Sequence, residues 1–191
     1  MAAGGNSANI HLGPGRLYYA PVGTAEPTSA STALDPAFVP VGYTEDGTQV
    51  ETEITSEAVE VAEELDPVLY SMTRRASRIT FAMAEMTVKR LALAMGGGAA
   101  RSEVGGAATQ PFVFPDPSSI QPVMFVWDSA ESPTDANNRR WVIYQARPSG
   151  TITTQRRKAP QKATLPVTFN CELASGQTTP IKVWPGPNGR I

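Results

Sequence analysis

Two alternating stretches decide the fold that we expect from this sequence. Residues 57–63 are Glu-Ala-Val-Glu-Val-Ala-Glu, and residues 77–83 are Ser-Arg-Ile-Thr-Phe-Ala-Met. In both, the larger apolar side chains take every second position, which is the pattern of a β-strand with one buried face. We interpret them as the two strands of a long antiparallel hairpin over residues 50–86. We expect its apolar face to contain Val59, Val61, Ile79, Phe81 and Met83.

The tip of this hairpin, residues 64–74, is too long for a tight turn, and loops of that length are commonly functional. A helix is predicted over residues 87–95. Thr87 can cap its N-terminus, and Gly96 follows at the position that favours a left-handed residue. Further strands are expected at residues 16–22, 38–43, 121–127, 139–147, 162–173 and 180–184.

These elements predict a mainly β fold, a β-sandwich or β-barrel with one flanking α-helix and a long hairpin arm. We assign residues 15–185 to one domain. Residues 1–14 are small and polar, as in an arm that is loose until it is bound, and residues 186–191 form a tail. No basic and apolar leader is visible, so we expect no secretory signal. The longest charge-free apolar stretch, residues 91–100, is about half as long as a membrane-spanning helix.

The charges are strongly polarised along the chain. The formal net charge is −2. Residues 1–66 contain 11 acids and one base, a net −10, whereas residues 67–191 contain 15 bases and seven acids, a net +8. Simple binding to nucleic acid or to a membrane surface needs no acidic half, so these functions are disfavoured. The distribution instead favours head-to-tail contact between copies of the chain.

No set of residues predicts catalysis, a cofactor or a metal site. Cys171 is the only cysteine, so no intramolecular disulfide and no cysteine–histidine zinc site is expected. The only histidine, His11, lies in the N-terminal arm, and nucleophile-elbow and phosphate-loop motifs are absent. Paired carboxylates of the hairpin could act as in a glycosidase or bind calcium, but none is isolated among apolar neighbours and no calcium-loop motif is present. We therefore predict that the protein is not an enzyme.

Residues 155–162, Gln-Arg-Arg-Lys-Ala-Pro-Gln-Lys, are the strongest candidate for nucleic-acid contact. The alternative is a loop that pairs with acidic residues of a neighbouring subunit. No aromatic residue accompanies the cluster, so a stacking platform for single strands is not supported. We favour the subunit contact.

The order of the elements and several short sequence segments resemble those of the major tail tube protein of long, non-contractile-tailed bacteriophages (siphophages), especially those of actinobacteria. After the small-residue arm comes a strand of the type Gly-Arg-Leu-Tyr-Tyr-Ala at residues 15–20 and a Thr/Ala/Pro loop. The similarity is best in residues 38–97. The segments that carry it are Val-Gly-Tyr-Thr-Glu-Asp-Gly at 41–47, Val-Glu-Val-Ala-Glu-Glu-Leu-Asp-Pro at 59–67, Ile-Thr-Phe-Ala-Met-Ala-Glu at 79–85, and the helix that ends in Met-Gly-Gly at 95–97.

This resemblance implies a structural virion protein that forms homohexameric rings, which stack into the tail tube and conduct the genome into the host. It implies assembly in the host cytoplasm, a place in the virion tail, and partners among the tape measure, terminator and distal tail proteins. Phage DNA would pass non-specifically through the lumen, and no cofactor or membrane is implied. In such proteins long hairpin tips, terminal arms and loops reach the next ring, and here these parts match residues 64–74, 1–14 and 23–36.

Two sets of residues follow as candidate contacts. If the acidic strand faces the lumen, its charge repels the DNA backbone, because phosphate–cation contacts would strengthen binding. The lumen-facing candidates are Ala58, Glu60, Ala62 and Thr80. The candidates for contact between rings are Glu63, Glu64, Asp66, Arg74, Arg75, Arg156, Arg157 and Lys158.

Other functions remain open at this point. A tail terminator or another ring-forming virion protein would have a similar sequence pattern. A carbohydrate-binding β-sandwich would also be all-β with exposed aromatic residues, for which Trp127, Trp141 and Trp184 are available.

Overall fold

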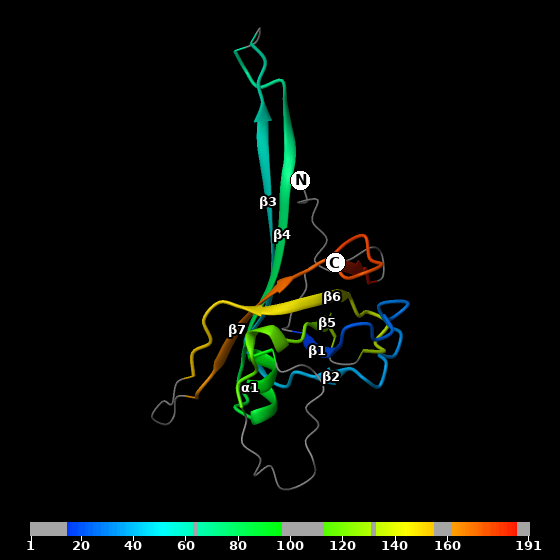
Figure 1. Cartoon of the computed structure of the whole chain (residues 1–191). Coiled ribbons are helices and arrows are strands. Elements are labelled where there is room, and N and C mark those ends of the chain that lie inside the picture. Colours follow the sequence, from blue (N-terminus) through cyan, green and yellow to red (C-terminus); the bar gives the residue numbers. More distant parts are fainter. Residues whose placement is uncertain (1–14, 63–64, 97–112, 131–132, 155–161, 187–191) are drawn as a thin grey trace, which may run out of the picture.

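The computed structural model describes residues 15–62, 65–96, 113–130, 133–154 and 162–186. The described chain is mainly β, with one antiparallel sheet of eight strands and one α-helix (Figure 1). The strands are β1 (Arg16–Pro21), β2 (Val39–Pro40), β3 (Thr44–Val59), β4 (Leu69–Met83), β5 (Val123–Asp128), β6 (Arg140–Ser149), β7 (Leu165–Cys171) and β8 (Ile181–Trp184). The helices are α1 (Val88–Ala94) and the short 3-10 helix η2 (Pro117–Ser119).

The sheet folds over on itself at β6. The strand order is β2-β1-β5-β6-β7-β4-β3, and β8 pairs with β6 outside this path. On one edge β6 pairs with β5, while its other edge is shared by β8, over residues 140–143, and β7, over residues 146–149. The β1–β5 part and the β7–β4 part therefore belong to one sheet but pack against each other as the two layers of a sandwich.

An aromatic cluster joins these two layers. The rings of Phe81 in β4 and Phe169 in β7 are stacked with centroids 5.9 Å apart. Phe125 in β5 meets both rings edge-on, at 5.8 and 4.9 Å. All three side chains are buried in the main core, together with apolar side chains of β1 and of α1. Such aromatic pairs add stabilisation beyond the apolar area that they bury.

Strand β5 is buried on both faces, which explains its continuous apolar run. Val123 and Phe125 point into the main core, whereas Met124 and Val126 belong to a second cluster on the opposite side. That cluster includes Phe38, from the loop between β1 and β2. The loop of residues 22–38 therefore covers the outer face of the sheet.

Helix α1 begins and ends as predicted. The Thr87 hydroxyl accepts a hydrogen bond from the Arg90 backbone N–H at 3.3 Å, and Gly96 adopts a φ of +76°. A side chain at Gly96 would also meet the side chain of Ile120 at 2.6 Å, so glycine is needed there for space and for conformation. Arg90 is buried and lies 3.6 Å from Glu85, which supplies a negative charge near the helix start.

The hairpin is confirmed, but two details of the prediction were wrong. The turn lies between Val59 and Leu69, with a hydrogen bond from Val68 N–H to Val59 O of 3.0 Å, so residues 69–74 belong to β4 and not to the tip. Val59 does not share a face with Ile79. Alternation along β3 places Val59 opposite to Val50, and Val50 is the residue that pairs with Ile79. Val59 is accordingly 41% exposed, whereas Ile79 is buried.

Replacement of Phe125 by Ala tests the packing between the two layers. We expect a loss of about 3–5 kcal/mol in the free energy of unfolding, measured in urea, because the change leaves a cavity between two other rings. Phe114→Ala is the matched control, since that ring is 65% exposed. It should cost within about 0.5 kcal/mol. Equal losses in the two variants would contradict the described core.

Candidate assembly interface

The β3–β4 hairpin is half buried in the body and half projecting from it. Strand β4 pairs with β7 only over Ser77–Met83, whereas it pairs with β3 along its whole length. Beyond Ser77 the two strands continue as a ribbon away from the body (Figure 1). We call this projecting part, residues 52–62 and 65–76, the arm. An isolated two-stranded ribbon is only marginally stable in water, so an arm of this kind is expected to gain cover on assembly.

One face of the arm continues the core face of the sheet and is almost uncharged. Pairing partners lie on the same face, so Thr52 with Ser77 and Ala58 with Tyr70 mark its two ends. At the lower end the hydroxyls of Thr52 and Ser77 are 2.9 Å apart. Above it Ile54, Tyr70 and Met72 are between 59% and 76% exposed. We call this the apolar face; its residues are Thr52, Ile54, Ser56, Ala58, Tyr70, Met72, Arg75 and Ser77.

The opposite face is polar and extends from the arm across the body. On β3 it carries acids, and on β4 it carries arginines. The same face continues over β7 and the end of β6, because Arg78 pairs in register with Asn170, and Asn170 with Arg147. We call this the polar face; its polar residues are Gln49, Glu51, Glu53, Glu57, Arg74, Arg78, Thr80, Arg147, Thr168 and Asn170. Next to the turn the same side also carries Val59 and Leu69.

The bases on the polar face of the body are matched by acids. Arg78 forms an ion pair with Glu51 on the neighbouring strand. Arg147 forms one with Glu172, with 2.9 Å between Nε and Oε2. These pairs are exposed and contribute little to stability. Their consequence is electrostatic, since neither guanidinium is left free to attract an anion at full strength.

The predicted lumen candidates do not share one face of the hairpin. Thr80 lies on the polar face, half-buried, with its hydroxyl 3.2 Å from that of Thr168. Ala58 pairs with Tyr70 and lies on the apolar face. Glu60 and Ala62 are exposed in the turn beyond β3.

The predicted contacts between rings lie in different parts of the molecule. Asp66 is exposed in the turn, and Arg74 and Arg75 are exposed in β4 on opposite faces. The others fall outside the described residues; they are Glu63, Glu64, Arg156, Arg157 and Lys158.

Sequence reasoning missed a groove at the root of the arm. It has a volume of about 190 Å³ and lies between the hairpin and the corner formed by β6 and β8. No motif could have indicated it, because its walls come from three separate segments of the chain. The lining residues are Thr52, Arg75, Ser77, Trp141, Thr179, Pro180 and Ile181.

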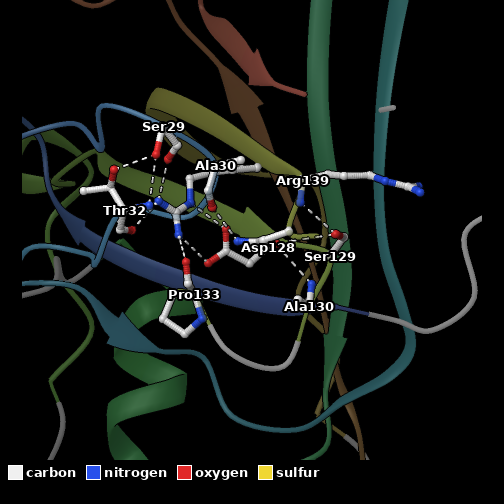
Figure 2. A network of polar contacts seen from close by, with 10 residues as sticks. Ser29, Ala30, Thr32, Asp128, Ser129, Ala130, Pro133 and Arg139 are labelled. Atoms are coloured by element: carbon white, nitrogen blue, oxygen red, sulfur yellow. Dashed lines mark hydrogen bonds and ion pairs between the residues drawn. The ribbon is translucent and has the colours of Figure 1, made fainter. Parts of the chain in front are cut away.

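A buried ion pair fixes the loop of residues 22–38 to the body (Figure 2). Arg140 and Asp128 face each other across β5 and β6, both side chains are fully buried, and two N–O contacts of 2.6 and 3.0 Å join them. The remaining guanidinium hydrogens reach the backbone oxygens of Ser29, Thr32 and Pro133 at 2.8–2.9 Å. All five donors of Arg140 are thus used, which is the arrangement that a buried arginine needs.

Asn138 adds a second attachment of the same loop. Its side-chain amide donates to Ala30 O at 2.8 Å, and its carbonyl accepts from the backbone N–H of Ala130 at 3.1 Å. Burial raises the pKa of Asp128, against the opposing effects of Arg140 and Asn138. A carboxyl whose pKa is raised on folding binds protons more tightly in the folded state, so Asp128 does not drive unfolding by acid.

A third attachment depends on the charge of Glu26. The carboxylate accepts a hydrogen bond from the Tyr144 hydroxyl and lies 2.9 Å from Nζ of Lys182. The bond from Tyr144 lowers the pKa of Glu26, burial opposes this, and Lys182 adds to the lowering. Burial and the nearby carboxylate raise the pKa of Tyr144.

The described residues provide little for other chemistry. No group of His, Cys, Asp and Glu within them is arranged to hold a metal ion. Burial raises the pKa of the Cys171 thiol to about 11, so the thiol is protonated at neutral pH. No helix within them has the length and apolar character needed to cross a membrane. A carbohydrate-binding sandwich would expose its tryptophans, but Trp127, Trp141 and Trp184 are all half-buried. Trp127 packs against Trp141 with ring centroids 6.0 Å apart.

Comparison with known proteins identifies the family. A family model described as phage tail tube protein matches residues 2–184. This chain belongs to the phage tail tube protein family. The protein is therefore a structural component of the phage tail, located in the virion tail, and not an enzyme. The family confirms the resemblance found in the sequence.

Two further comparisons add little to the tail tube assignment. No curated protein matches the sequence. Among solved structures, a chain from the cryo-EM structure of the anti-feeding prophage baseplate, 6-fold symmetrised, is 12% identical. The match covers 96% of this chain and 97% of that chain with a TM-score of 0.45, which is too weak to support an argument.

The contribution of the buried ion pair to stability can be tested by comparing the same Arg→Met change at the buried Arg140 and at the exposed Arg147. Arg140→Met leaves Asp128 buried without its partner, and we expect it to cost about 3–5 kcal/mol of the free energy of unfolding in urea. Arg147→Met removes an exposed pair and should cost within about 1 kcal/mol. Losses of similar size in both variants would show that Arg140 does not hold the loop.

The Glu26 attachment predicts a defined pH dependence. Because its pKa is lowered in the folded state, ionised Glu26 stabilises the fold above its usual pKa of 4.5, and this contribution disappears as pH falls through the lowered pKa. Glu26→Gln should therefore be less stable than the unmodified chain at neutral pH, and the difference should shrink in acid. The measurement is urea unfolding of both proteins across this range, and a difference independent of pH would contradict the assignment.

Proposed function

We propose that this tail tube protein forms homohexameric rings that stack into a hollow tube, the conduit through which the genome is delivered into the host. The main support is the two-sided hairpin. Its polar face continues over the body, and its apolar face presents large side chains that no described residue of the chain covers. Large exposed apolar surfaces of this kind mark sites of protein association.

We propose that the polar face lines the lumen. A surface of threonine, asparagine and charged side chains stays hydrated, and Arg78 and Arg147, each paired with an acid, would hold a passing phosphate backbone only weakly. Thr80 belongs to this face, whereas Glu60 and Ala62 are exposed in the turn beyond β3. Ala58 lies on the apolar face, which by the same reasoning meets a neighbouring subunit. DNA would then pass without sequence-specific contact.

We propose that rings stack through the charge poles of the chain. The turn at one end of the arm is acidic, and the bases Arg74 and Arg75 lie near its other end. The predicted basic residues 156–158 fall outside the described residues. A contact between opposite ends is heterologous and does not close, so it builds a filament. Complementary charge would also select the register of stacking.

The proposed assembly takes place in the host cytoplasm and involves the tape measure, terminator and distal tail proteins. A tail terminator would also form a ring, but it would stop at one ring. An arm whose apolar face is exposed and whose turn points away from the body favours repeated stacking.

Electron microscopy of the purified chain, alone and with initiating tail parts, tests this function. We expect stacked rings with sixfold symmetry. The double variant Tyr70→Ser, Met72→Ser should reduce assembly at least tenfold while the unfolding midpoint of the monomer stays unchanged. Leu173→Ser is the matched control, since Leu173 is exposed but lies outside the arm. Monomers under all conditions would contradict the proposal, and single rings that never stack would support the terminator.

A further inference from the structure

The groove at the root of the arm combines apolar walls with a guanidinium group. Trp141, Pro180 and Ile181 provide the apolar surface, and Arg75 lies at the hairpin side. Arg75 is exposed and forms no ion pair with another described residue. The groove is therefore suited to an apolar side chain that carries an acidic neighbour.

A second arginine marks the same level of the arm on its other face. Arg74 lines a polar groove of about 410 Å³ together with Glu53 and Asn170, and it too has no ion-pair partner among the described residues. The third base of this region, Arg78, is paired with Glu51. The root thus has two cations without an ion-pair partner in the described part of the chain, one on each face of the hairpin.

The turn of the arm has the opposite character. Residues 57–73 contain five acids and no base. Leu65 is fully exposed at 105%, and Val61 and Val68 beside it are 41% and 55% exposed. Glu60 and Asp66, in the same turn, are also exposed. The turn therefore offers apolar side chains with acidic neighbours, which is what the root groove lacks.

The turn of one chain cannot reach the groove of the same chain. Leu65 and Thr52 lie 13 positions apart, which at about 3.3 Å per residue allows a separation of at most about 43 Å. Regular pairing with β4 from Thr52 to Val59, seven positions or about 23 Å, keeps the two ends apart. Only a second copy can bring the two complementary surfaces together.

We propose that the root groove is the docking site for the turn of a second copy in the adjacent ring, an inference that rests on the proposed stacking. Leu65 enters between Trp141 and Ile181, and Glu60 and Asp66 lie near Arg74 and Arg75. The surfaces are different on the two partners, so each copy uses both and the contact repeats along the tube.

This docking makes the arm a spacer between rings. The turn of one copy and the groove of the next coincide, so the shift from ring to ring equals the separation of turn and groove within one chain. The axial repeat of the tube should therefore be at most about 43 Å, and shorter if the hairpin is tilted to the tube axis.

Disulfide trapping in assembled tubes tests the contact directly. Copies with Leu65→Cys are mixed with copies with Thr179→Cys, which lines the groove. Oxidation should give a cross-linked dimer in tubes and none in unassembled protein. Cys171 can remain, because its pKa of about 11 keeps the thiol protonated at neutral pH. Ser118→Cys, exposed in η2, replaces Thr179→Cys as the control and should give at least tenfold less dimer.

Charge reversal provides a second readout. Arg74→Glu with Arg75→Glu should abolish stacking while single rings persist, and addition of Glu60→Arg with Asp66→Arg in the same chain should restore tubes. The docking site is wrong if tubes form but the cross-link equals that of the Ser118 control. It is also wrong if the variant with reversed arginines stacks normally. In either case the ring-and-tube function stands. If the unmodified chain forms no rings at all, the proposed function itself fails.

Discussion

The whole molecule depends on a mismatch in strand length. Strand β4 pairs with β3 along its full length, but β7 accompanies it for only seven residues, Ser77–Met83. Below Ser77 the hairpin is one wall of a sandwich, and its inward side chains join the aromatic core. Above it the same alternation continues without a partner layer. The core face therefore runs on into an exposed apolar face, and the outer face runs on as a polar one. The same alternation of side chains along β3 and β4 thus fills the core in the body and leaves an uncovered apolar face on the arm.

The second feature on which the structure depends is the attachment of the loop between β1 and β2 to the body. Burial of Asp128 and Arg140 is costly, and it is tolerated because the pair is bidentate and every remaining donor of Arg140 finds a backbone oxygen. The effect is to hold the loop of residues 22–38 over the second apolar cluster. The tail tube subunit thus has a rigid outer layer at one end and a bare ribbon at the other. Rigid bodies joined through projecting arms can build a regular stack, because the arm alone sets the offset between copies.

Most elements have clear signals in the sequence, whereas the assignment of side chains to the two faces of the hairpin has weaker ones. Most strand positions were predicted within a few residues, and Thr87 and Gly96 marked the ends of α1, because caps and alternation are local properties. The exception is β3, which begins at Thr44 and ends at Val59, so Val61 lies beyond it. The apolar face of the hairpin was assigned wrongly, since Val59 and Ile79 both alternate but only the register decides which of them share a side. The Asp128–Arg140 pair and the root groove could not be predicted either. Their parts come from segments far apart in the chain, and no single segment has an unusual composition.

By itself, the sequence determined the β class, the single helix, the absence of catalytic motifs and the polarised charge, because each of these follows from neighbouring residues or from composition. It also determined the family, through the order of its elements. Only the tertiary structure decided where β7 ends along β4, and with it which half of the hairpin is buried and which half projects. That choice depends on contacts between strands more than 80 positions apart. Pairing at such a distance is fixed by the packing of the complete core and leaves no local trace in the sequence.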